Sequence, residues 1–188
     1  MRYSTDRYPQ HSLLLFIAIV LASFFLHTGA IAAKVKDYAK GDVPKSFKLF
    51  SDGKGRFAVS YPGDWDAPKP DDEGVQIFAP DNSSNMRIQV FDVGEDSLES
   101  IARATKDGLK KNIKAIKFLS DRPAAFGAHK ARHRVFQGEV QGTLVKIGQL
   151  LFKKGNRMFV INYGSTPKRW DEHSAVSKKI IASLKPGK

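Results

Sequence analysis

Two consecutive segments, 143–153 and 157–163, carry apolar residues at even and at odd positions alike. Side chains of a strand alternate between its two faces, so a strand of this kind must be covered by protein on both sides. The short link Lys154-Gly155-Asn156 favours a hairpin of two antiparallel central strands. Their apolar residues are Leu144, Val145, Ile147, Leu150, Leu151, Phe152, Met158, Phe159, Val160 and Ile161.

Six further segments have strand patterns and two have helical ones. Asp96 and Glu99 show the spacing of a capping box at the start of the first helix. Ser165 or Thr166 can cap the second helix. This order, with its short links, predicts an α+β fold in which an antiparallel β-sheet is flanked by helices on both faces, an α/β/α sandwich. The predicted strands are 46–50, 56–61, 75–79, 86–93, 115–120 and 129–137, and the predicted helices are 96–112 and 168–184.

Residues 1–33 have the pattern of a secretory signal peptide, with two arginines, an uncharged apolar run over 13–26 and small residues before the cleavage position. That run would span about 21 Å as a helix, short of the roughly 30 Å hydrocarbon core, which favours cleavage over a retained anchor. We therefore expect a tether over 34–45, a domain over 46–188, and a periplasmic or extracellular location. The chain has no cysteine, so neither disulfides nor thiolate metal sites support it.

Charge is divided unevenly along the chain. Residues 34–107 hold 11 basic and 14 acidic side chains, whereas residues 108–188 hold 18 basic and 4 acidic ones. A cationic half of this kind favours an anionic partner, and the bland alternative is that the charge only keeps the protein soluble. A secretion signal directs the protein to a compartment where nucleic acid is scarce. The sequence also has no motif for nucleic-acid recognition, so we expect no nucleic-acid partner.

Six basic residues are the candidate partner-binding side chains. Lys130, Arg132 and Arg134 alternate with other residues, which predicts three cations on one face of a strand. The other three recur four residues apart on the first helix and just beyond it: Lys106, Lys110 and Lys114. We expect this basic side to meet an acidic protein or a membrane-associated complex of the envelope, with peripheral membrane contact as a variant.

The strand Phe57-Ala-Val-Ser-Tyr-Pro followed by Trp65 resembles the PsbP-like family, which comprises the photosystem II extrinsic protein PsbP and bacterial secreted relatives. Further matching pieces are Ser97-Leu98-Glu99 at the first helix, Gly127 and Ala131 before a strand, and Ile180-Ile181-Ala182-Ser183-Leu184 at the end. The resemblance implies a non-catalytic, cofactor-free domain that docks onto or helps to assemble a larger, often membrane-bound, complex. We expect it to act as a monomer.

Other kinds of site have weaker patterns. His129 and His133 lie four apart, which on a strand separates them by about 13 Å. Asp71, Asp72 and Glu73 could supply oxygen ligands, but their spacing does not fit a calcium loop. We expect no metal and no catalytic residues. Two alternatives stay open: an envelope hydrolase, and a carrier or sensor with a pocket between sheet and helix, lined from Phe118, Phe126, Phe136, Phe152 and Phe159.

Overall fold

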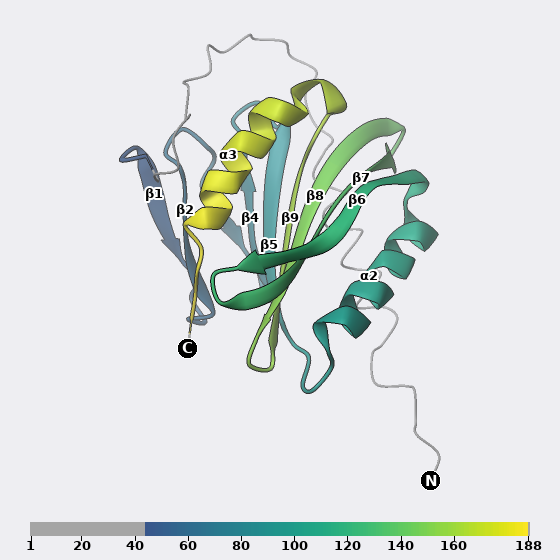
Figure 1. Ribbon diagram of the computed structural model, residues 1–188. Helices are drawn as coiled ribbons and strands as arrows, with labels where there is room; N and C mark the ends of the chain where they lie inside the picture. Colours follow the sequence, from purple (N-terminus) through teal and green to yellow (C-terminus); the bar gives the residue numbers. More distant parts are fainter. Residues whose placement is uncertain (1–43, 188) are drawn as a thin grey trace.

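The computed structural model describes residues 44–187. The predicted signal peptide and residues 34–43 of the predicted tether lie outside the described residues. Two antiparallel sheets and two α-helices make up the fold (Figure 1). The small sheet has the order β1 (Phe47–Ser51), β2 (Phe57–Pro62), β10 (Lys185–Pro186). The large sheet has the order β3 (Lys69–Pro70), β4 (Gly74–Phe78), β5 (Ser84–Asp92), β9 (Arg157–Ser165), β8 (Thr143–Lys154), β7 (His129–Val140), β6 (Lys114–Phe126).

The two helices cover opposite faces of the large sheet. On β9, Phe159, Ile161 and Tyr163 belong to the main core, which also contains Trp170 and Ile180 of α3 (Trp170–Ala182). The alternate β9 residues face the other side, in a cluster with side chains of α2 (Leu98–Asn112). A 3₁₀ turn, η1 (Pro167–Arg169), leads into α3. The α/β/α arrangement is confirmed, and the doubly apolar hairpin β8–β9 lies near the middle of the large sheet.

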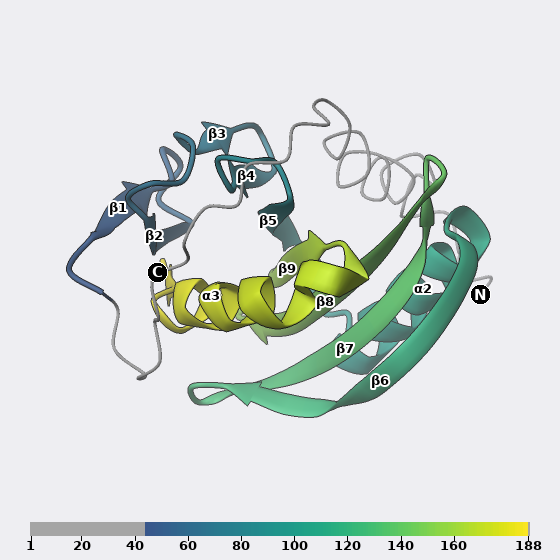
Figure 2. The ribbon, with the colours of Figure 1, turned by 90° about the horizontal axis from the view of Figure 1, so that it is seen from above.

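The small sheet was not predicted from the sequence. β1 and β2 form the expected hairpin, but β2 pairs on its other side with β10, and neither strand joins the large sheet. Figure 2 shows α3 lying between these strands and the long ribbon of β6 and β7. Phe57, Val59 and Tyr61 of β2 are buried in the main core against α3. The small sheet thus covers one side of α3, and the β6–β7 ribbon lies on its other side.

A tight turn follows β2, directly after Tyr61 and Pro62. The backbone N–H of Trp65 donates to the carbonyl of Pro62 at 3.1 Å, which forms a tight turn after β2. A Cβ at Gly63 would lie 2.4 Å from the carbonyl oxygen of Ser46, so only glycine fits this turn. Trp65 is partly buried against the main core.

β6 is longer than predicted and lies at the edge of the large sheet. It continues through Pro123 to residue 126, and its pairing with β7 shifts register twice, between Lys114 and Lys117 and between Phe118 and Ser120. Proline is compatible with an edge strand because no further strand needs its missing N–H. The segment between the predicted strands 56–61 and 75–79 also contains a two-residue strand, β3. No helix among residues 44–187 has the length and apolar character to cross a membrane.

Candidate functional site

Three of the six predicted cations converge on one carboxylate that sequence reasoning missed, Asp121 of β6. Lys106 of α2 donates to its Oδ2 at 2.8 Å, and Arg132 of β7 donates to its Oδ1 at 2.6 Å. The guanidinium of Arg134 lies 3.7 Å from Oδ1. Burial alone would raise the pKa of Asp121, but the hydrogen bonds of Arg132 and Lys106 and the charge of Arg134 lower it to about 2.

Arg134 does not project into solvent, so the prediction of three exposed cations on one strand face is wrong at this residue. Its side chain is 1% exposed. Nη2 donates to the carbonyl of Ala102 in α2 at 2.8 Å, and Nη1 donates to Oε1 of Gln149 at 3.2 Å. Gln149 in turn donates to Asn162 on β9 at 2.8 Å. Arg134 therefore ties α2 to the sheet, because a buried guanidinium needs such partners.

The other predicted cations are at the surface. Lys110 lies 3.4 Å from Asp107, and Lys114 lies 3.9 Å from Glu139, in both cases as exposed pairs of the kind that contribute little stability. Lys130 is exposed near the β6–β7 turn. These three remain available to a partner, and their contribution to binding stays a prediction.

The acidic candidates for a metal site are engaged by nearby side chains. Asp71 lies 2.6 Å from the guanidinium of Arg87, which is 1% exposed. Glu73 accepts a hydrogen bond from Gln89 at 2.9 Å, and Asp72 pairs with a lysine, Lys54. The guanidinium of Arg87 thus lies beside Asp71 and Glu73, in the place where these two carboxylates would hold a metal ion. Within residues 44–187 no three histidine or acidic side chains are placed to hold one ion.

The two candidate histidines instead take part in rows of stacked rings on the α3 face. The imidazole of His133 stacks on Tyr163, with ring centres 6.4 Å apart, and Tyr163 stacks on Trp170 at 5.5 Å. Nε2 of His133 also lies 3.1 Å from the hydroxyl of Tyr163. Burial raises the pKa of Tyr163 to about 12, so the phenol stays protonated. His129 stacks on Phe152 at 6.0 Å.

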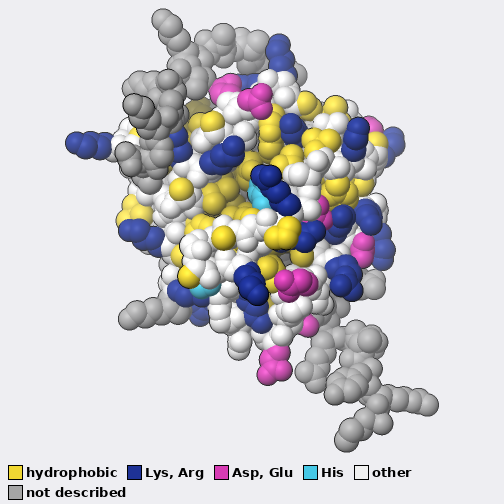
Figure 3. All heavy atoms as spheres, viewed as in Figure 1, with side chains coloured by type: hydrophobic (Ala, Val, Ile, Leu, Met, Phe, Trp, Pro, Cys, Tyr) yellow, Lys and Arg dark blue, Asp and Glu magenta, His cyan; other side chains and the backbone are white. Residues whose placement is uncertain are grey.

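The space between α3 and the β6–β7 ribbon is the α3-side groove, a surface that sequence reasoning did not identify. Figure 3 shows hydrophobic side chains gathered in the middle of this face, with lysine and arginine side chains around them. Half-buried apolar residues border the main core here, from both β6–β7 and α3: Ala124, Phe126, Val135 and Ile181. Strand register and the helix place basic residues on the same side: Lys117, Arg122, Lys146 and Lys178. The one pair that could have indicated the groove is Arg122 and His133, which lie opposite each other in the register of β6 and β7.

A serine and a histidine meet where the β4–β5 turn contacts the start of α3. Oγ of Ser83 lies 3.0 Å from Nε2 of His173. That hydroxyl donates to Asp81 at 2.5 Å and accepts a hydrogen bond from Arg169 at 2.7 Å. In a hydrolytic triad the carboxylate orients the histidine, whereas here it binds the serine. His173 is 6% exposed, and the arrangement fastens the turn to α3.

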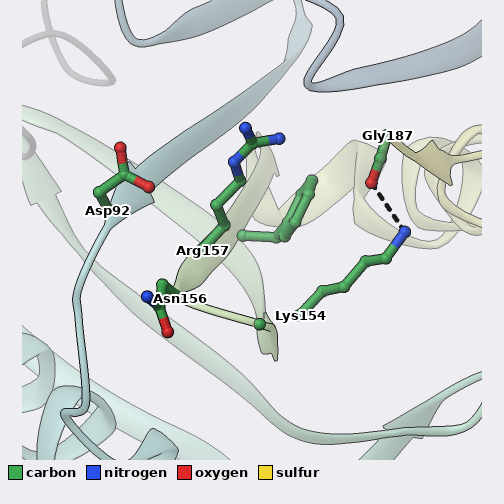
Figure 4. Close-up of a pocket in the computed structure, with 7 residues that line it drawn as sticks. Asp92, Lys154, Asn156, Arg157 and Gly187 are labelled. Carbon is green, nitrogen blue, oxygen red and sulfur yellow. Dashed lines mark hydrogen bonds between the residues drawn. The ribbon is translucent and has the colours of Figure 1, made fainter.

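A pocket of about 570 Å³ lies at the β8–β9 turn, at one end of the sheet (Figure 4). Nζ of Lys154 donates to the carbonyl of Gly187 at 2.7 Å and to that of Pro186 at 3.1 Å. Asp92 and Arg157 are opposite each other in the β5–β9 register. Lys154 therefore holds the segment after α3 against the hairpin. The pocket does not lie between sheet and helix, where the carrier alternative requires one.

Several solved structures are similar to this chain. The solution structure of cyanobacterial PsbP (CyanoP) from Synechocystis sp. matches with a TM-score of 0.59 and 9% identity, covering 81% of this chain and 98% of that one. A Pseudomonas aeruginosa protein of unknown function, PA94, described as a putative regulator, matches with a TM-score of 0.54 and 12% identity over 76% of this chain and 98% of that one.

A crystal structure from Bacteroides thetaiotaomicron matches with a TM-score of 0.57 and 19% identity over 76% of this chain, which spans about half, 49%, of that protein's length. No protein-family model and no curated protein match the sequence. The chain thus has a PsbP-like fold, as the Phe57–Trp65 stretch suggested.

Proposed function

We propose that the protein is an exported, non-catalytic binding domain that docks through its basic side onto an anionic protein of a membrane-associated envelope complex. The observation that carries this proposal is the charge of α2, β6 and β7. Residues 98–140 hold ten lysines and arginines against four acids. Three of these acids form ion pairs within the domain, with Lys106 and Arg132, with Lys110 and with Lys114, and the fourth lies at the start of α2. The remaining basic side chains leave a surplus of positive charge at the surface.

The surplus includes exposed side chains without an internal carboxylate partner among residues 44–187. Arg103 and Lys111 on α2, and Lys130 near the β6–β7 turn, are of this kind. A surface of one sign raises association rates with a partner of the other sign and disfavours like-charged partners. The PsbP-like fold supports a role in contact with other proteins. The hydrolase alternative gains no support from Ser83 and His173, because the carboxylate of Asp81 binds the serine and not the histidine.

The proposal is tested by crosslinking in the native envelope, followed by mass spectrometry. Lys110, Lys114 and Lys130 are each changed to Glu, which leaves the buried pairs of Asp121 intact. We expect recovery of the partner to fall by at least about tenfold, because three attractions become repulsions. Recovery from the unchanged protein should also fall at high salt, since the Debye length shrinks from about 10 Å at 0.1 M to about 3 Å at 1 M.

The matched control carries the same charge change outside α2 and the β6–β7 ribbon. Lys45, Lys69 and Lys185 are exposed, and their replacement by Glu alters the net charge equally. Partner recovery should be retained in this control. If both triple variants recover the same partner as the unchanged protein, docking through the basic side is wrong.

A further inference from the structure

The α3-side groove combines an apolar floor with a basic rim. Docking by net charge alone would need no apolar floor. We propose that this groove binds an amphipathic acidic segment of the partner protein, with apolar side chains of the segment on the groove floor and its carboxylates on Arg122 and Lys178. This inference rests on the proposed docking function and adds to it the chemistry of the docked segment.

A stack of flat rings, in which Tyr163 is 3% and Trp170 8% exposed, lies directly beneath the floor of the groove. Tyr163 lies between His133 and Trp170 in a stack whose interplanar angles are 22° and 14°. A Cβ at Gly148 would lie 2.2 Å from Cζ of Tyr163, so the ring rests directly on the backbone of β8. A floor already ordered in this way requires little loss of side-chain entropy when a partner binds.

The floor itself is formed by apolar side chains that remain partly exposed. Ala124 and Phe126 of β6, Val135 of β7 and Ile181 of α3 contact the main core without being fully buried. They come from both walls of the groove. Covering them would remove apolar area from water, which is the main favourable contribution in most protein association.

Each wall of the groove carries a cation whose charge acts on His133. Burial is the main cause that lowers the pKa of His133, and the positive charges of Arg122 and Lys178 lower it further, so both cations act on this ring, one from β6 and one from α3. Both are exposed, and neither forms an ion pair within residues 44–187. Lys146 lies over Trp170 with its ammonium 4.9 Å from the ring centre.

The wall formed by the sheet has no negative charge to compensate for these cations. Strand alternation places the α3-facing residues of β6 and β7 at Ser120, Arg122, Ala124 and Phe126 and at His129, Ala131, His133, Val135 and Gln137. None of these is acidic, and Asp121 points to the opposite face, towards Arg134. The occupant that fits such a surface is therefore apolar on one side and acidic at its edges.

The shape of the groove favours a segment of polypeptide. Figure 3 shows it as an open depression on the surface, whereas small-molecule sites bury most of their ligand. α3 has 13 residues, about 20 Å of helix, along one wall. An amphipathic helix laid beside α3 can place residues at positions i, i+3, i+4 and i+7 on the floor, a recurring mode of recognition.

The test uses the full protein labelled with ¹⁵N and two synthetic helical probe peptides. Both peptides have leucine at helical spacing, and they differ only in carrying glutamate or lysine at the other positions. We expect the acidic peptide to shift the amide resonances of His133, Val135 and Lys178, and the basic peptide to bind at least about tenfold more weakly because of repulsion by the rim. Equal binding of both peptides, or shifts confined to α2, would overturn the inference.

Two variants separate this inference from the wider docking proposal. Replacing Arg122 and Lys178 by Glu should weaken the acidic peptide by at least about tenfold, whereas replacing Arg103 and Lys111 of α2 by Glu should leave its affinity within about twofold. In the envelope crosslinking experiment, partner recovery that is lost in the α2 variant and kept in the groove variant would leave docking intact and refute the groove. Loss in the groove variant supports both.

Discussion

Asp121 shows how one side chain can fix the positions of several others. Lys106 and Arg132, which the sequence suggested as partner-binding cations, are held in place by this carboxylate, and the buried Arg134 has its only nearby negative charge there among the described residues. Alternation in the strand predicted correctly that Arg132 and Arg134 share a face, but it could not show what that face meets. Asp121 is 11 residues from Arg132 and 15 from Lys106, and its pairing depends on strand register and helix packing.

We predict that Asp121→Asn lowers the free energy of unfolding by about 2 kcal/mol at pH 7, in line with the lowering of the Asp121 pKa from 3.8 to about 2. A carboxyl whose pKa is lowered by folding stabilises the protein above its unfolded pKa. The difference between the two proteins should therefore be fully present above pH 4 and shrink as the pH falls towards 2. Urea unfolding followed by circular dichroism at several pH values measures it.

The control for this prediction is Asp107→Asn. Asp107 pairs with Lys110 at 3.4 Å, but both side chains are more than half exposed, so we expect almost no change in stability. An Asp121→Asn protein as stable as the unchanged one at pH 7 would show that Asp121 does not organise its cations.

At the scale of elements, the long and strongly periodic segments were predictable and the non-local ones were not. β5 and β9 lie within two residues of their predicted bounds because their side chains alternate or are apolar throughout. β3 and β10 were missed, since each has two residues and exists only through a partner strand. β6 was predicted too short because Pro123 suggests a break, whereas an edge strand accepts proline.

The N-cap of α2 differs from its prediction by one residue. Ser97, not Asp96, is the N-cap, and its Oγ accepts a hydrogen bond from the backbone N–H of Ser100 at 3.1 Å. Aspartate and serine cap helices about equally well, so spacing to Glu99 alone chose the wrong one of two neighbours.

We predict that Ser97→Ala lowers the free energy of unfolding by about 1 kcal/mol, because the first turn of α2 loses an acceptor for one backbone donor. Ser97→Asp should retain stability, since a carboxylate caps well and favours the positive end of the helix dipole. Denaturant unfolding of both variants measures the effect. Ser100→Ala is the control, and a loss there as large as in Ser97→Ala would contradict the role of the Ser97 side chain.

For the whole molecule, β8 connects all three hydrophobic clusters. Leu150 and Phe152 belong to the main core, Val145 and Ile147 to the cluster near the end of α2, and Leu151 to the cluster that includes Ala102. The α3 and α2 sides of the sheet thus share one central strand. The two sides should unfold together, since neither core survives the loss of this strand.

We predict that Leu151→Ala lowers the free energy of unfolding by about 2–5 kcal/mol and moves the transitions seen by far-ultraviolet circular dichroism and by tryptophan fluorescence equally. Leu151 is 0% exposed and faces α2, whereas Trp170 reports from the α3 side. Leu144→Ala, at a residue 49% exposed, is the control and should change stability by less than about 0.5 kcal/mol. Transitions that separate in the variant would show that the two sides unfold independently.

The position of β6 at the border of the large sheet bears on how the protein behaves at high concentration. Long edge strands tend to pair with the edge strand of a second molecule, and repeated pairing of this kind can extend into fibrils. Here two register shifts bend the ladder, Pro123 lacks a donor, and the exposed charges of Lys117 and Arg122 would be set against their counterparts in the next copy. The same cations that invite an acidic partner thereby keep identical molecules apart.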